Sequence, residues 1–210
     1  MIRKKIYVVR HGQTDYNKMG VVQGSGIDAP INELGKQQAN AFFEAYQDIQ
    51  IEKVFFTGLQ RTRQSIIRFI EEKGLPFEAV PEFNEISWGI YEGVPMTDEE
   101  NAYYQHMLKR WSAGELNYAI EGGESPVMVA DRLKRGMEKV LAGEEKTILI
   151  CMHGRAMRIL LSVLLNYNLK YMDNFIHENL GCYELSLMSD GSYRLDVFNN
   201  TDHLKALHSL

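Results

Sequence analysis

The stretch Lys5-Ile6-Tyr7-Val8-Val9-Arg10-His11-Gly12 decides the fold. It is apolar without a break from Ile6 to Val9, which predicts a strand buried on both faces that ends at Arg10. A second stretch of this kind, residues 147–152, ends directly before His153 and Gly154. The sequence therefore predicts two strands that each carry a His-Gly pair at the carboxyl end.

Strand ends of this kind are typical ligand sites. In open parallel α/β sheets, ligands bind beyond the carboxyl ends of the strands, where the helix that follows directs its amide N–H groups. A helix is expected over residues 155–165, and Gly12 and Gly154 let the backbone approach a ligand closely. One His-Gly pair alone could be no more than a turn. Two in equivalent positions, one of them beside Arg10, predict a site that transfers a phosphoryl group to a histidine.

Length and composition indicate one domain over residues 1–210. With 45% hydrophobic residues, a chain of this length buries a substantial core. A net charge of −5 argues against nucleic acid as a partner. The longest apolar stretch, residues 159–165, is too short to span a bilayer, and the basic N-terminus lacks the apolar region of a signal peptide. We therefore expect a cytoplasmic protein without a membrane partner, in which Cys151 and Cys182 are packed, reduced thiols.

Strands and helices alternate along the chain. We expect strands at residues 5–10, 53–57, 77–80, 147–152, 182–188 and 193–198, and helices at 32–48, 59–73, 98–111, 126–141 and 155–165. Residues 12–30 are expected to form a loop, and residues 81–123 an irregular, cap-like segment. The predicted fold class is α/β, a three-layer sandwich with a mostly parallel central sheet flanked by helices and one antiparallel strand at or near its edge.

Two further residues are candidates for chemistry. Arg61 falls in the first turn of an expected helix, where a cation opposes the helix dipole unless an anion is bound. The alternative is a solvated surface arginine. Glu85 lies in an aromatic and glycine-rich loop, residues 84–93, where a carboxyl group can be partly desolvated and serve as a general acid. Glu92, in the same loop, competes with Glu85 for that role.

Six motifs in order carry a resemblance to a known family. They are Arg10-His11-Gly12-Gln13-Thr14 with Asn17, Gln23-Gly24 with Asp28-Ala29-Pro30-Ile31, Thr57-Gly58-Leu59-Gln60-Arg61-Thr62, Glu85 with Gly89 and Glu92-Gly93, Gly122-Gly123-Glu124-Ser125, and Met152-His153-Gly154. A closing motif at residues 199–204 is similar as well. The chain resembles the histidine phosphatase superfamily, in the branch that contains cofactor-dependent phosphoglycerate mutases and small-molecule phosphatases.

The resemblance implies a role for each matching residue. His11 would be the nucleophile, kept neutral because nearby arginines lower its pKa. Arg10, Arg61 and His153 would donate hydrogen bonds to the phosphoryl oxygens, and Glu85 would protonate the leaving oxygen and then activate water. The phosphate cradle would be completed by Thr14, Asn17, Gln23, Gly24 and the amide of Gly154. No metal and no cofactor is implied, because no carboxylate cluster accompanies the two histidines.

Some positions depart from the family pattern. Gly58 replaces a proline, Cys151-Met152 replaces the more usual serine, and Arg155 replaces a small residue, either as an extra substrate contact or as a surface charge. Ile86 stands where the mutases carry an arginine. This departure, the short segment between Glu85 and Gly122, and the Gln23-Gly24 loop favour a phosphatase over a mutase. The resemblance then implies a metal-independent phosphomonoester hydrolase with a phosphohistidine intermediate. A phosphoglycerate mutase that uses Lys109 and Arg110, and a non-catalytic module that binds a phosphorylated ligand, are the alternatives.

The substrate class is a small phosphorylated metabolite, and its identity stays open among sugar phosphates, phosphoglycerates and an α-ribazole-type phosphate. Aromatic residues of the cap-like segment either line a specificity wall or pack the cap; they are Trp88, Tyr103, Tyr104 and Trp111, together with His106. A homodimer is likewise left open.

Overall fold

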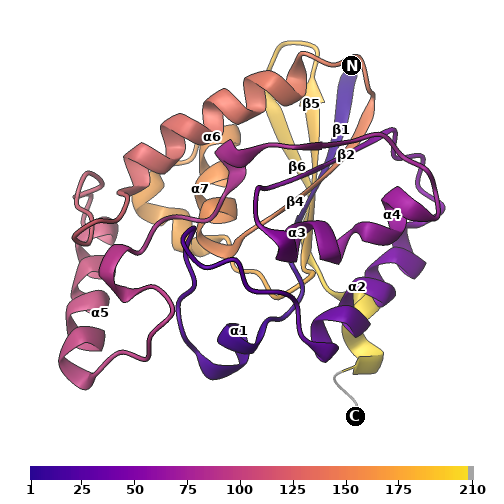
Figure 1. Ribbon diagram of the computed structural model, residues 1–210. Helices are drawn as coiled ribbons and strands as arrows, with labels where there is room; N and C mark the ends of the chain where they lie inside the picture. The colour runs from indigo at the N-terminus through magenta and orange to yellow at the C-terminus, as the bar shows by residue number, and fades with distance from the viewer. Residues whose placement is uncertain (208–210) are drawn as a thin grey trace.

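One six-stranded sheet forms the centre of the computed structural model, which describes residues 1–207 (Figure 1). The strand order is β3 (Phe77–Ala79), β2 (Lys53–Phe56), β4 (Thr147–Met152), β1 (Ile2–Arg10), β5 (Cys182–Met188) and β6 (Tyr193–Asn200). β5 pairs antiparallel with both of its neighbours, and the other pairings are parallel. The predicted mostly parallel sheet with one antiparallel strand near its edge is confirmed.

The central pair β1–β4 positions the two histidines. Arg10 pairs with Met152 in the parallel register, and the His11 N–H donates to the Met152 carbonyl at 3.0 Å. His11 and His153 therefore follow neighbouring strand ends, and their ring centroids lie 5.2 Å apart.

Two helical layers cover the sheet, as the predicted sandwich requires. On one face, Tyr7 and Val9 pack with α2 (Glu33–Tyr46) and α4 (Ile67–Glu71). On the other, Ile6 and Val8 pack in the cluster that contains α6 (Pro126–Leu141) and α7 (Gly154–Leu164). Figure 1 shows these pairs of helices on opposite sides of the strands. Because β1 alternates between two apolar clusters, its sequence has to be hydrophobic on both faces.

Two local expectations were wrong. The expected loop at residues 12–30 contains a short helix, α1 (Asp15–Met19), which Thr14 and Asn17 start with a reciprocal capping box. The expected helix over 59–73 is divided into α3 (Gln60–Ser65) and α4, because Ile66 leaves the helical conformation with φ −125° and ψ 14°. The Ile66 side chain is buried in the α2–α4 core, so tertiary packing overrides the helical pattern there.

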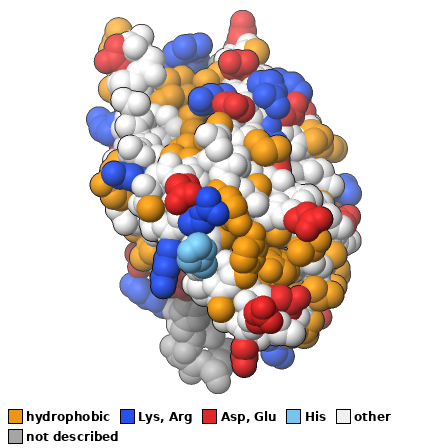
Figure 2. All heavy atoms as spheres, turned by 90° about the vertical axis from the view of Figure 1, so that its left-hand side faces the viewer, with side chains coloured by type: hydrophobic (Ala, Val, Ile, Leu, Met, Phe, Trp, Pro, Cys, Tyr) orange, Lys and Arg blue, Asp and Glu red, His pale blue; other side chains and the backbone are white. Residues whose placement is uncertain are grey.

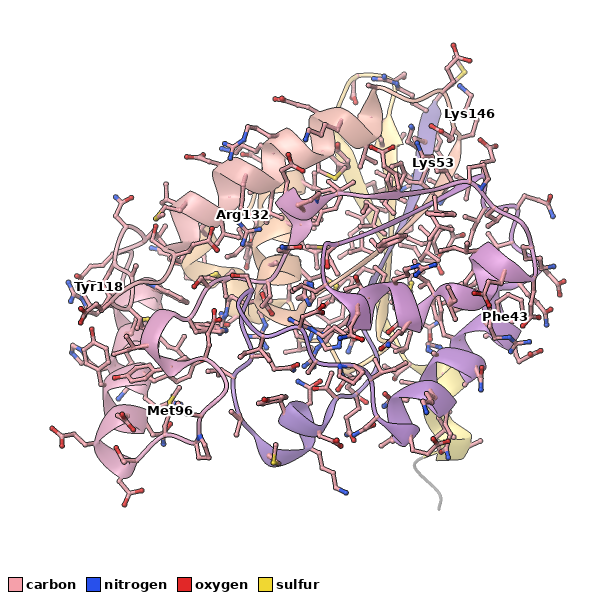
Figure 3. All side chains as sticks on the ribbon, viewed as in Figure 1. Phe43, Lys53, Met96, Tyr118, Arg132 and Lys146 are labelled. Carbon is pink, nitrogen blue, oxygen red and sulfur yellow. The ribbon has the colours of Figure 1, made fainter. Side chains whose placement is uncertain are left out.

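Residues 81–123 form the cap segment, which contains η1 (Pro81–Phe83), η2 (Gly89–Tyr91) and α5 (Asp98–Ser112). Arg132 of α6 connects this segment to the rest of the domain (Figure 3). Its guanidinium donates to the carbonyls of Glu82, Asn84 and Glu85 at 2.7, 2.7 and 3.0 Å, and it forms an ion pair with Glu124. Figure 2 looks onto the face that carries α5, where hydrophobic and charged side chains are interspersed. Two short 3-10 helices, η3 (Leu169–Asn174) and η4 (Asp202–Leu207), complete the elements.

Candidate active site

A pocket of about 390 Å³ lies at the carboxyl ends of β1 and β4. Most residues predicted for the site line it, namely Arg10, His11, Asn17, Gln23, Gly24, Arg61, Glu85 and Gly154. Thr14 and His153 lie behind this lining, and both are fully buried.

The ring of His11 is held in one tautomer. Its Nδ1 atom lies 2.7 Å from the carbonyl oxygen of Gly12, which can only accept, so Nδ1 carries the proton and Nε2 keeps its lone pair. Burial, followed by the charges of Arg61 and Arg10, lowers the pKa of His11 well below its ordinary value. A neutral imidazole with a free Nε2 in a pocket is the protonation state that a nucleophile needs.

His153 has both ring nitrogens engaged. Its Nδ1 accepts from Arg61 Nε at 3.2 Å, so Nε2 carries the proton and donates to the Thr57 hydroxyl at 2.9 Å. Burial and the charge of Arg61 lower the pKa of His153 well below its ordinary value. In this arrangement His153 orients the Arg61 guanidinium rather than facing the pocket with a free donor.

Arg61 is fully buried and held by neutral groups. Besides His153, its guanidinium donates to the carbonyls of Ile27 at 2.6 Å and Gly24 at 2.9 Å. The Nε of Arg10 is buried and has no hydrogen-bond partner in the described part of the chain. Burial lowers the pKa of both groups, that of Arg10 to about 10, while the negative charge of Glu85 opposes this. The buried Arg61 guanidinium and the half-buried Arg10 guanidinium, whose Nε is unpartnered, favour an anionic ligand.

Glu85 sits at the start of α7. Its Oε1 accepts from the amides of Ile86 at 2.9 Å and Ala156 at 2.8 Å, and its Oε2 accepts from Arg155 at 3.0 Å. The amides that we expected to face a phosphate thus hold this carboxylate instead, leaving Gly154 as the residue at the start of α7 that faces the pocket. The geometry fixes the carboxyl group beside the histidines.

Glu92, the other candidate for the general acid, connects two loops through hydrogen bonds. It accepts from the amides of Trp88 and Gly26, both at 2.8 Å, and joins the cap segment to the loop at residues 20–30. It is not among the residues that line the pocket.

The loop residues divide into two groups. Thr14 caps α1 through its hydroxyl, which accepts from the Asn17 amide at 3.1 Å, so its contribution to the site is indirect. Asn17 lines the pocket, and its Oδ1 accepts from Thr14 N and Asn179 Nδ2, both at 3.2 Å. Gln23 lines it too, and its buried Oε1 has no partner within residues 1–207.

The aromatic residues of the cap segment serve both expected purposes. Trp88 and Tyr104 line the pocket, whereas Trp111 is buried and stacks on Trp88 with ring centroids 5.8 Å apart. Tyr103 and His106 are exposed residues outside the pocket lining.

Several pocket residues carried no motif. Arg158, His177 and Asn179 also line the pocket, and of its α7 and β5-side residues only Arg155 was singled out from the sequence. Asn179 lies beside the nucleophile, because its Nδ2 donates to the His11 carbonyl at 2.9 Å. Arg158 could have been found from the sequence, because it follows Arg155 by three residues and therefore lies on the same face of the helix. His177 and Asn179 come from an irregular segment before β5 and had no comparable signal.

The part of the chain that the structure describes holds neither a metal-binding cluster nor a membrane-spanning helix. Within residues 1–207, no group of three or more His, Cys, Asp or Glu side chains is placed to hold a metal ion. None of the helices in that range is long and apolar enough to cross a membrane.

Known proteins are similar to this chain in sequence and in architecture. Phosphoserine phosphatase 1 of Hydrogenobacter thermophilus is 26% identical over 95% of this chain and 94% of its own. The Erwinia tasmaniensis protein named probable phosphoglycerate mutase GpmB is 30% identical over 77% of this chain and 74% of its own. The structure of mycobacterial glucosyl-3-phosphoglycerate phosphatase with VO3 is 26% identical, with a TM-score of 0.82 over 94% of this chain and 100% of that one.

The family is decided by the extent of the match. The model of the histidine phosphatase superfamily (branch 1) matches residues 6–201, from β1 to the residue after β6. This chain belongs to the histidine phosphatase superfamily.

Proposed function

We propose that this protein is a phosphatase of small phosphorylated metabolites that passes the phosphoryl group through His11 and needs no metal ion. The observation that carries this proposal is the neutral His11 ring, with Nδ1–H donated to Gly12 and Nε2 free, in a pocket lined by the guanidinium groups of Arg10 and Arg61. The phosphatase names among similar proteins support it.

In the first step, His11 Nε2 attacks phosphorus and the bond from phosphorus to the leaving oxygen breaks. Glu85 enters this step as the neutral carboxylic acid, gives that oxygen its proton and becomes a carboxylate, and the alcohol leaves. The bond from Nδ1–H to the Gly12 carbonyl stabilises the positive charge that develops on the ring. Arg10 and Arg61 hold the phosphoryl oxygens and stabilise their charge in the transition state.

In the second step, water attacks the phosphohistidine. The Glu85 carboxylate takes a proton from the water, the N–P bond breaks with its electrons returning to Nε2, and inorganic phosphate leaves. We assign Asn17, Gln23, Gly24 and Gly154 to the lining that positions the phosphoryl group. His153 keeps Arg61 in place and would bind a phosphoryl oxygen only by releasing Thr57.

A phosphoglycerate mutase is the second candidate, because one relative at 30% identity carries that name. The basic pair that a mutase would require from this chain does not reach the pocket lining. Lys109 is exposed, and Arg110 pairs with Glu115 and stacks on Tyr118. The geometry therefore favours hydrolysis.

Phosphate release in the presence of EDTA tests the proposal. p-Nitrophenyl phosphate and a panel of sugar and glycerate phosphates should release phosphate whether or not 2,3-bisphosphoglycerate is added. Isomerisation of 3-phosphoglycerate that depends on the bisphosphate, without net phosphate release, would replace the proposal with the mutase. Loss of all release on adding EDTA would contradict the metal-free mechanism.

A further inference from the structure

Arg155 points its side chain into the pocket although nothing in the phosphoryl-transfer steps uses it. The side chain is only 9% exposed, and the guanidinium carbon lies 5.9 Å from the ring centroid of Trp88 and 5.6 Å from that of Trp111. Its Nη1 pairs with Asp173, and Tyr104 lines the same pocket. A guanidinium has five N–H donors, so donors remain for a ligand.

Arg155 shares its carboxylate partner with a second arginine. Arg158, one turn along α7, pairs with the same Oδ1 of Asp173, so two cations share one carboxylate. His177 lies beside Arg158, with Nε2 3.2 Å from Arg158 Nε and 2.8 Å from the Gly154 carbonyl. Burial and neighbouring arginines lower the pKa of His177 to about 2, so this ring is neutral. Because Arg155 and Arg158 both use Asp173 Oδ1, N–H donors of both guanidinium groups remain for an anionic ligand at this wall of the pocket.

The position of this wall defines which end of a substrate it would meet. The amide of Arg155 holds Glu85 Oε2 at 3.0 Å, and Glu85 is the group that we assign to the leaving oxygen. The Arg155 side chain therefore lies on the side of the alcohol that leaves, next to Trp88 and Tyr104. A group bound here belongs to that alcohol.

Resting on the proposed function, we infer that Arg155 and Arg158, joined by Asp173, form a subsite for a carboxylate on the alcohol part of the substrate. The preferred substrates are then short phosphomonoesters that carry a carboxylate near the ester carbon. The Trp88 face would cover the carbon chain between the two anionic groups. The phosphoryl group would occupy the Arg10–Arg61 end of the same pocket.

A matched pair of esters tests this subsite. 3-Phosphoglycerate and glycerol 3-phosphate have the same three-carbon skeleton and differ at the terminal carbon, a carboxylate in one and a hydroxymethyl group in the other. We expect the wild type to favour the carboxylate ester in kcat/KM by about 10- to 100-fold, the range of a hydrogen bond to a charged group. Arg155→Met should remove most of that preference, mainly through KM, whereas a merely structural arginine would affect both esters equally.

Two further variants make the test selective. Arg110→Met removes an arginine that also pairs with a glutamate and stacks on an aromatic ring, but outside the pocket, and should leave the preference unchanged. Asp173→Asn removes the carboxylate that Arg155 and Arg158 share and should shift selectivity toward an ester with a second phosphate. This variant also serves if Arg155→Met does not fold.

Binding separates this inference from the proposed function. Calorimetry on a His11→Ala protein measures the affinity for both esters without turnover. A wild type that hydrolyses neither these esters nor p-nitrophenyl phosphate would refute the proposed function, while tighter binding of the carboxylate ester would still support the subsite. Equal kcat/KM and equal affinity for the two esters, or a wild-type preference for a second phosphate over the carboxylate, would overturn it.

Discussion

The two ends of the pocket are built differently. The phosphoryl end consists of Arg10 and His11 at the end of β1, His153 at the end of β4, and Arg61 in the first turn of α3. The side chains of His11, His153 and Arg61 are held by backbone carbonyls, by Thr57 or by one another. The alcohol end is made of side chains from the cap segment and from α7, namely Trp88, Tyr104, Arg155 and Arg158. The first end is fixed by the sheet, whereas the second depends on contacts between segments far apart in the sequence.

This difference assigns different tasks to the two ends. Strand ends in the sheet centre have few ways to move, which suits a nucleophile that must meet phosphorus in line. Loops and surface helices can change without disturbing the sheet, which suits the selection of substrates. Changes at the phosphoryl end should therefore affect every substrate, and changes at the alcohol end should affect some substrates more than others.

The largest effect is expected from His11→Ala. Loss of the nucleophile should lower turnover by roughly 10⁴-fold or more for all esters, since no other group in the pocket lies in its position. The far-UV circular dichroism and melting temperature should stay close to those of the wild type. Turnover above a few per cent of wild type would remove His11 from the nucleophile role.

Glu85→Gln sharpens the comparison because this residue lies between the two ends. We expect the rate to fall roughly 10²–10⁴-fold for alkyl phosphates, the usual scale of general acid catalysis. The loss should be much smaller for p-nitrophenyl phosphate, whose leaving group hardly needs a proton. Equal losses on both substrates would indicate a structural role.

Glu92→Gln is the matched control for that experiment. Glu92 also accepts two backbone amides, but it joins loops and does not line the pocket. Its replacement should lower stability without making the rate depend on the leaving group.

A smaller effect concerns how the stability of the folded protein depends on pH, because three buried histidines are neutral in it. The pKa values of His11, His153 and His177 all lie below the ordinary 6.5, so as the pH falls below 6.5 the unfolded chain binds protons that the folded protein does not. Each such group lowers the free energy of unfolding by up to about 1.4 kcal/mol per pH unit, or about 4 kcal/mol for the three together. Urea unfolding at pH 7, 6 and 5 measures this slope, and a flat profile would contradict it.

The same contrast explains what could be predicted from the sequence. β1 and β4 are apolar on both faces and each ends in His-Gly, so the strand type and the meeting of the two histidines followed from local pattern. The break at Ile66 comes from core packing that no local pattern contains. Arg158, His177 and Asn179 reach the pocket only because α7 and residues 175–181 fold against it. Likewise, the engagement of both nitrogens of His153 depends on Thr57, which lies 96 residues away.

The most direct test of the central claim is to identify the phosphorylated residue. Wild-type protein mixed with p-nitrophenyl phosphate in EDTA is quenched in alkali, where phosphohistidine survives, and analysed by peptide mass spectrometry alongside His11→Ala. Our account predicts one phosphoryl group on His11 Nε2 in the wild type, and none in the variant. A phosphoryl group on another residue, or phosphate release with no phosphoenzyme at any quench time, would contradict it.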